Sequence, residues 1–149
     1  MSTRSVIAKL DSKTKKIKAV YCHNDGYLAH NGCILDSHYQ YESKVDEFLK
    51  HGDISSLGNN IGVKVDFNDY KTVKLNEQCR FYGRDRGEEN REATIVKNES
   101  ALLEHAFEYC DAEYVYMFAY GTWYVYDNSN AIGDSSHQFI ELDEALYTV

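Results

Sequence analysis

The chemically able side chains of the chain are most concentrated between Tyr21 and Tyr27, in the order Tyr-Cys-His-Asn-Asp-Gly-Tyr. An imidazole accepts or donates a proton near neutral pH, and a neighbouring carboxylate can orient it. His23 and Asp25 therefore provide the two groups that acid–base catalysis requires at a minimum, an imidazole and a carboxylate. The alternative, which we favour, is structural: Cys22 packs in the core, His23 caps a carbonyl group and Asp25 makes a turn.

A second charged motif runs from Gly83 to Gly87, where two arginines flank an aspartate. Guanidinium groups are bidentate donors for phosphate or carboxylate, and the bounding glycines predict an exposed loop. Joined to the first motif, it would form a nucleotide or phosphodiester site. That site would comprise His23, Asp25, Tyr27, Arg84, Asp85 and Arg86. A self-paired, solvated charge run is the reading that we favour, because Glu88 and Glu89 would repel an anion.

Five potential zinc ligands occur within seventeen residues: Cys22, His23, His30, Cys33 and His38. Only the pair His30-x-x-Cys33 has a spacing that resembles that of metal ligands, and no second pair follows. We therefore expect no metal and no cofactor. The four cysteines of the chain lack CxxC spacing and are expected to be reduced.

Charge is distributed unevenly along the chain. Residues 99–149 contain ten carboxylates and no Lys or Arg, which leaves residues 1–98 with a net charge of +2 against −10. A uniformly acidic segment disfavours direct DNA binding and suits contact with a basic partner. Ordinary solubility is the competing explanation, because a net charge of −8 is common for a domain of this size.

The same acidic segment is rich in tyrosine, a residue that gives a large contact area at low entropic cost. Tyrosines that bridge core and surface within a sheet are the alternative. The partner surface predicted from charge and tyrosine together consists of Glu104, Glu108, Asp111, Glu113, Tyr116, Tyr120, Tyr124, Tyr126 and Asp127.

Hydrophobic periodicity predicts the elements that must position these groups. Expected strands cover 5–10, 16–21, 63–67, 72–75, 79–82, 93–96, 114–118 and 123–126. Expected helices cover about 33–39, 43–51, 98–110 and 142–146, the second capped by Ser43 and followed by Gly52. Residues 53–62, 83–91 and 129–137 are expected to be loops.

These elements predict one domain over residues 1–149, because 43% hydrophobic content suffices for a single core. Strand runs interrupted by helices, without regular βαβ alternation, favour the α+β class, with a mainly antiparallel sheet and two to three helices. No run of eighteen apolar residues and no apolar leader occurs, so we expect a cytoplasmic protein without a membrane segment. The oligomeric state stays open.

Five segments carry distinctive motifs: Met1–Ala8 (MSTRSVIA), Tyr21–Tyr27 (YCHNDGY), Gly52–Gly58 (GDISSLG), Gly83–Glu88 (GRDRGE) and Tyr114–Val125. Together they span most of the chain, and they resemble an uncharacterised family of small proteins encoded by phages and prophages. This chain departs from the family at Asn24, where an aromatic residue is usual, and at 30–32, where Gly-Val-Gly is usual. The resemblance implies an accessory product of a mobile element and no particular reaction.

Two functions follow from these observations. The first is binding: a counter-defence inhibitor of the anti-CRISPR or DNA-mimic type, whose acidic surface docks on a host defence protein or protein–nucleic-acid complex with a basic groove. The second is a nucleotide-binding protein or phosphodiesterase that uses His23, Asp25, Arg84 and Arg86. We favour the binder.

Overall fold

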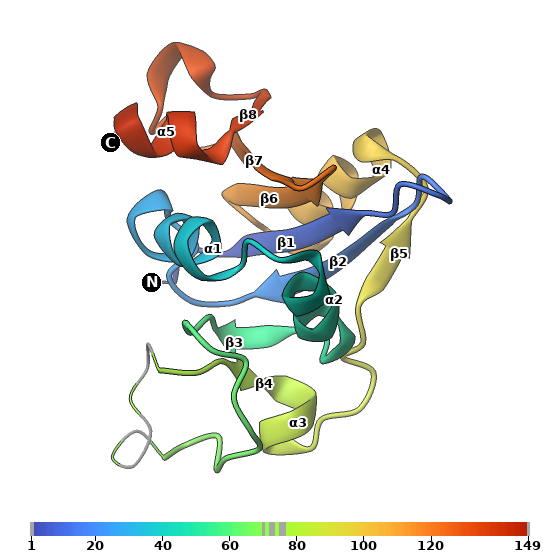
Figure 1. Cartoon of the computed structure of the whole chain (residues 1–149), viewed down its shortest axis with the longest axis vertical. Coiled ribbons are helices and arrows are strands. Elements are labelled where there is room, and N and C mark those ends of the chain that lie inside the picture. The colour runs from blue at the N-terminus through green and yellow to red at the C-terminus, as the bar shows by residue number, and fades with distance from the viewer. Residues whose placement is uncertain (1, 70, 72–73, 75–76, 149) are drawn as a thin grey trace.

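The computed structural model describes residues 2–69, 71, 74 and 77–148. A mixed β-sheet forms its centre, with strands in the order β4-β3-β2-β1-β6-β7-β8 and β5 paired to β2 (Figure 1). Among the described residues, five of the seven strand pairings are antiparallel; β1 with β6 and β2 with β3 are parallel. The strands are β1 Ser5–Leu10, β2 Ile17–Cys22, β3 Ile54–Ser56, β4 Arg80–Phe81, β5 Thr94–Val96, β6 Tyr114–Ala119, β7 Thr122–Asp127 and β8 Phe139–Glu141.

Short helices connect the strands and confirm the predicted α+β class with a mainly antiparallel sheet. They are the π-helical turn η1 Leu28–Gly32, α1 Cys33–His38, α2 Glu42–Lys50, α3 Tyr82–Arg86, α4 Glu99–Glu104, the π-helical turn η2 His105–Tyr109, the 3₁₀ turn η3 Gly133–Ser135 and α5 Leu142–Thr148. The helices of the described chain thus exceed the predicted two to three. In that part of the chain no helix combines the length and the apolarity needed to cross a bilayer.

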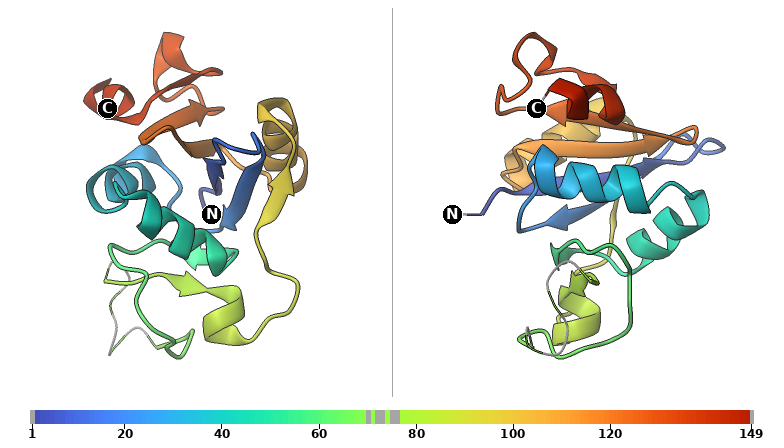
Figure 2. Two further views of the ribbon diagram at one scale, coloured as in Figure 1. Left: turned by 45° about the vertical axis from the view of Figure 1, so that its right-hand side comes forward. Right: turned by 60° about the vertical axis from the view of Figure 1, so that its left-hand side comes forward.

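Successive strand residues point to opposite sides of the sheet, and helices cover both sides, so both faces are buried. Ile7 and Val20 pack in a core that includes side chains of α1, α2 and α5. Val6 and Ala19 pack in a second core with side chains of α4 and η2. Figure 2 shows α1 and α2 on one side of the strands and α4 on the other. We call these the α2 face and the α4 face.

Local signals predicted the best-formed elements correctly. The β1–β2 and β6–β7 hairpins are present, and the Asn98 side chain accepts the Ala101 N–H at 2.8 Å at the start of α4. Helix α2 ends before Gly52, whose φ of +80° favours glycine. A Cβ there would lie 2.1 Å from the Arg91 carbonyl oxygen. The predicted Ser43 cap is wrong: Tyr41 is the N-cap residue of α2, and its side chain makes no capping hydrogen bond.

Residues 61–69 do not form the strand predicted from the alternation of Val63, Val65 and Phe67. Val63 is 72% exposed, and the described part of this segment has no strand partner. The predicted strand at 72–75 lies largely outside the described residues. Conversely, Ile54–Ser56, predicted as loop, forms β3 beside the end of β2.

Side chains take the place of a strand partner for this segment. The buried guanidinium of Arg80 donates to the carbonyl oxygens of Asp66 and Phe67, at 2.6 and 3.2 Å, and to that of Asp69. Arg84 donates to the carbonyl oxygens of Ile61, Gly62 and Cys79. Tertiary polar contacts therefore override the period-two pattern, because they satisfy backbone groups that a sheet would otherwise pair.

Candidate functional site

The motif at 21–27 begins with the last two residues of β2 and ends at Tyr27, the residue before η1. Cys22 is fully buried, and its Sγ lies 3.3 Å from Asn31 Nδ2 and 3.4 Å from the Asn24 carbonyl oxygen. Burial raises the pKa of the Cys22 thiol to about 12. This cysteine is therefore a core group and not a nucleophile, as the structural reading of the motif predicts.

His23 is the end of a hydrogen-bond chain on the α4 face. Arg4 Nε donates to Tyr21 Oη at 3.1 Å, and Tyr21 Oη lies in hydrogen-bond contact with His23 Nδ1 at 2.6 Å. Burial, followed by the positive charge of Arg4, lowers the pKa of His23. The neutral imidazole is therefore the favoured form near pH 7.

Asp25 and Tyr27 serve the turn that follows. Asp25 has a φ of +56°, and its carbonyl oxygen accepts the Asn31 N–H at 3.3 Å. The Tyr27 ring is 41% exposed and lies 6.1 Å from the ring of His30. Neither residue lines the pocket beside Tyr21.

That pocket lies where β2 changes neighbours, and it has a volume of about 430 Å³. Its lining residues are Arg4, Tyr21, Asp53, Arg91, Tyr109, Cys110 and Asp111. Two ion pairs cross it: Arg4 Nη1 lies 3.0 Å from Asp111 Oδ2, and Arg91 Nε lies 3.3 Å from Asp53 Oδ2. The site thus offers guanidinium, hydroxyl and carboxylate groups for a polar ligand.

Sequence reasoning missed this pocket because its members are far apart in the chain. Arg4 and Asp111 are separated by 107 positions, and neither belongs to a motif with the other. Arg4, Tyr21 and Asp53 each belong to a motif singled out from the sequence, but to three different motifs. Parallel pairing of β1 with β6 brings the two distant segments together.

Cys110 and His105 form a thiol–imidazole pair at the edge of the pocket, with 3.5 Å between Sγ and Nε2. Burial, and then the charge of Asp53, raises the pKa of Cys110 to about 11. A nucleophilic cysteine requires the opposite shift, since the thiolate is the reactive form. This pair is therefore not an activated nucleophile.

The structure does not bring Arg84, Asp85 and Arg86 into a shared site with His23. Cys22, Ile54 and Phe81 lie in one row across β2, β3 and β4, and β4 runs opposite to β2. The chain therefore leaves this row in opposite directions after Cys22 and after Phe81.

The polar groups of this second motif are also largely occupied. The Asp85 carboxylate is buried and accepts the N–H groups of Val65 and Phe81, at 3.0 and 2.8 Å. Arg84 Nε bonds to that carboxylate at 2.9 Å, and Arg86 pairs with Glu88. The predicted exposed loop is wrong for residues 83–86, which belong to α3 because Asp85 and Arg84 turn inward, whereas residues 87–91 form no helix or strand, as predicted.

The zinc hypothesis receives no geometric support. Within the described ranges, no three His, Cys, Asp or Glu side chains converge as metal ligands would. Cys22 faces Asn31 and His30 Nδ1 lies 2.9 Å from Asn31 Oδ1, while Cys33 is exposed.

Most residues of the predicted acidic surface are accessible, but two are not. Tyr116 is fully buried and donates its hydroxyl to the Gly26 carbonyl oxygen at 2.6 Å. Asp127 is also fully buried, where its carboxylate accepts four hydrogen bonds from residues 129–136. Both were predicted to contact a partner, and burial removes them from that role.

The remaining members differ in their pairing. Asp111 pairs with Arg4, and the exposed Tyr120 accepts a hydrogen bond from Lys15 Nζ at 2.9 Å. Glu104, Glu108 and Glu113 are exposed and have no ion-pair partner among the described residues. We call these three the free carboxylates.

The fold and the pocket define the chain as an α+β domain with a mixed sheet covered on both faces and a polar pocket at a fork in that sheet. Comparison of the chain with protein-family models, with curated proteins and with solved structures finds no match. Function is therefore inferred from the site alone.

Proposed function

We propose that the protein acts by binding and not by catalysis, as a phage-derived counter-defence inhibitor of the anti-CRISPR or DNA-mimic type. The observation that carries the proposal is the exposure of the free carboxylates Glu104, Glu108 and Glu113 on η2 and its flanks. Such a surface repels DNA phosphates and complements the basic groove of a host nucleic-acid-binding complex. The resemblance to phage and prophage proteins supplies the biological setting.

Aromatic side chains flank these carboxylates and add contact area. Tyr109 at the end of η2 is 79% exposed. Tyr126 packs on the α4 face with its ring 5.5 Å from that of Phe107, and Tyr124 precedes it by two positions on the same face of β7. Partly buried tyrosines beside charged groups are typical of protein interfaces.

The chemistry of the pocket supports binding over catalysis. The Cys110 thiol is protonated at neutral pH because its pKa is raised to about 11. His23 Nδ1 is engaged in a hydrogen bond with Tyr21 Oη, so this nitrogen is not free to take a substrate proton.

The test reverses the free carboxylates together, as Glu104→Lys, Glu108→Lys and Glu113→Lys. Immobilised wild-type protein should capture a partner from host lysate, and the on-rate of the purified pair should fall steeply as salt rises past about 0.1 M, where the Debye length is about 10 Å. The triple variant should lose capture while its thermal melt changes little, since exposed charges contribute little to stability.

A matched control reverses three exposed acids elsewhere: Glu47→Lys, Glu89→Lys and Glu92→Lys. This variant has the same net charge and should retain the partner. If both triple variants capture it equally well, the acidic surface is not the binding site.

A second candidate function is nucleotide binding, and the pocket beside Tyr21 is the observation that favours it. Its guanidinium groups come from Arg4 and Arg91, in place of the predicted Arg84 and Arg86. Calorimetric titration with a panel of mono-, di- and cyclic nucleotides tests this function. Binding by the wild-type protein that disappears in the Arg4→Gln/Arg91→Gln variant would establish a nucleotide site. Absence of a binding signal for every nucleotide of the panel would contradict this function.

A further inference from the structure

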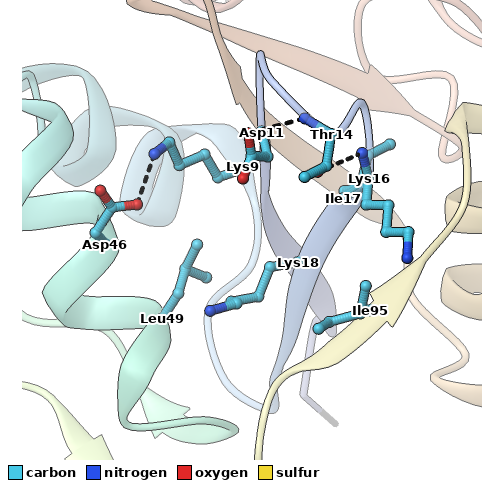
Figure 3. Close-up of a pocket in the computed structure, with 9 residues that line it drawn as sticks. All are labelled: Lys9, Asp11, Thr14, Lys16, Ile17, Lys18, Asp46, Leu49 and Ile95. Carbon is cyan, nitrogen blue, oxygen red and sulfur yellow. Dashed lines mark hydrogen bonds and ion pairs between the residues drawn. The ribbon is translucent and has the colours of Figure 1, made fainter.

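A second cavity lies on the α2 face, between α2 and the strands β2 and β5 (Figure 3). It has a volume of about 300 Å³, at the lower end of the about 300–1,000 Å³ typical of small-molecule sites. Figure 3 shows that β2 and β5 form one side of it and α2 the other. Its lining residues are Lys9, Asp11, Thr14, Lys16, Ile17, Lys18, Asp46, Leu49 and Ile95.

Strand register aligns the key side chains of this cavity. Lys9, Lys18 and Ile95 lie in one row across β1, β2 and β5. Lys16 and Lys18 are two positions apart, so both side chains stand on the same face, about 6.5–7 Å apart along the strand. Figure 3 shows Lys18 extending toward Leu49 of α2 and Lys16 extending toward β5.

The three lysines differ in how their charges are balanced. Lys9 Nζ lies 2.6 Å from Asp46 Oδ1 and 3.0 Å from Glu42 Oε1, so α2 neutralises it. Lys16 and Lys18 are exposed, and no carboxylate of the described chain pairs with either ammonium group.

The acidic lining residues cannot supply the missing charge. Asp46 is held by Lys9, and Asp11 Oδ1 accepts the N–H groups of Lys13 and Thr14 within its own turn. Lys18 also stands directly opposite Lys9 in the β1–β2 register. Because Asp46 and Glu42 already neutralise Lys9, Lys18 is the ammonium group of this row that has no carboxylate partner among the described residues. An anion beside Lys18 would balance its charge.

Apolar surface accompanies the two ammonium groups. Ile95 is 61% exposed, an uncommon state for isoleucine, and it flanks Lys18 in the row. Leu49 of α2 lines the same cavity and is otherwise buried. The methylene stems of the lysines extend this surface, because long charged side chains cover apolar neighbours with their stems.

We propose that this cavity binds a small amphipathic anion, an aliphatic or aromatic carboxylate or sulfonate. The acid group lies beside the ammonium group of Lys18, and the apolar body lies against Ile95 and Leu49. This site shares no residue with the acidic surface or with the pocket beside Tyr21, so it stands or falls independently of the proposed function.

The test uses 8-anilinonaphthalene-1-sulfonate as a fluorescent probe of the folded protein. The probe should bind at one site and be displaced by octanoate, but not by octanol, which lacks the charge, or acetate, which lacks the tail. Lys16→Glu/Lys18→Glu should raise the dissociation constant at least about tenfold, because a charge-assisted contact is replaced by repulsion. Ile95→Ser should weaken binding by roughly threefold to fivefold, through lost apolar contact.

The matched control is Lys13→Glu/Lys64→Glu, which changes the net charge equally at exposed positions outside the cavity. It should alter the dissociation constant less than about twofold at 0.15 M salt, because distant charges are screened. Absence of saturable binding, equal displacement by octanol, or equal weakening by the two double variants would each overturn the proposal. Binding to anionic phospholipid vesicles without binding of monomeric octanoate would overturn it as well.

Discussion

Asp53 Oδ1 accepts the main-chain N–H of Tyr21 at 2.9 Å, and this side chain stands where a neighbouring strand is missing. Strand β2 pairs with β5 through Ala19 and with β3 only from Cys22. Tyr21 lies between these two pairings, and without Asp53 its main-chain N–H would have no partner on this side of β2. The same carboxylate pairs with Arg91, so Asp53 both satisfies the backbone of β2 and positions a guanidinium group of the pocket beside Tyr21.

Replacing Asp53 should separate these two roles. Asp53→Ala leaves the Tyr21 N–H without its acceptor and Arg91 without its ion-pair partner, and it should lower the free energy of unfolding by roughly 1–3 kcal/mol. Asp53→Asn keeps a carbonyl oxygen for Tyr21 and loses only the charge beside Arg91, so its loss should be smaller. Urea unfolding of both variants measures the difference. Equal stability of Asp53→Ala and wild type would show that the fork does not depend on this side chain.

Asp127 should stabilise the loop at 129–136 in a pH-dependent way. Burial raises its pKa, but hydrogen bonds from Ser129, Ile132 and Ser136 outweigh burial, and the net shift is downward. A carboxyl group with a lowered pKa stabilises the fold above its ordinary pKa of about 3.9, and that stability is lost as pH falls through the folded-state pKa.

Asp127→Asn should therefore lower the free energy of unfolding by roughly 1–3 kcal/mol at pH 7. The difference from wild type should persist at pH 5 and shrink below about pH 4. Denaturant titrations at pH 7, 5 and 3 provide the measurement. A difference independent of pH would mean that the charge of Asp127 does not contribute.

Arg84 should hold residues 61–69 more firmly than its neighbour Arg86 does. Arg84→Lys loses the planar fork that reaches three carbonyl oxygens and Asp85, and should cost roughly 1–3 kcal/mol and increase protease cleavage within 61–69. Arg86→Lys, at a more exposed ion pair, should cost less than about 1 kcal/mol. The two variants are compared by thermal melts and limited proteolysis, and similar behaviour would contradict the assignment.

Cys110 should react slowly with iodoacetamide at pH 8, because its pKa is raised to about 11 by burial and then by Asp53. Its rate should rise about tenfold per pH unit up to the pKa, since the thiolate is the nucleophile. Peptide mass spectrometry after timed alkylation follows this residue separately from the exposed Cys33. A rate already at its plateau near pH 8 would indicate an activated thiol and would reopen the catalytic reading.

Elements with local signals were predictable from sequence. The β6–β7 hairpin follows from two alternating aromatic runs joined by Tyr120-Gly121, and both turn residues have positive φ, at 51° and 80°. The stripe of Val45, Phe48 and Leu49 is likewise enough for α2, because all three face one core. The fold class and the best-formed helices and hairpins thus follow from local sequence patterns.

Which polar groups are available for binding depends on contacts between distant segments of the chain. From the sequence alone, Arg84 and Asp127 cannot be distinguished from exposed charged residues. In the structure, the side chain of each makes hydrogen bonds to backbone groups that need a partner. The pocket beside Tyr21 depends on Arg4, Asp53 and Arg91, which meet because strand order, not sequence spacing, sets their neighbours. Charge and periodicity are local properties of a sequence, whereas burial and pairing depend on segments that are distant in the chain.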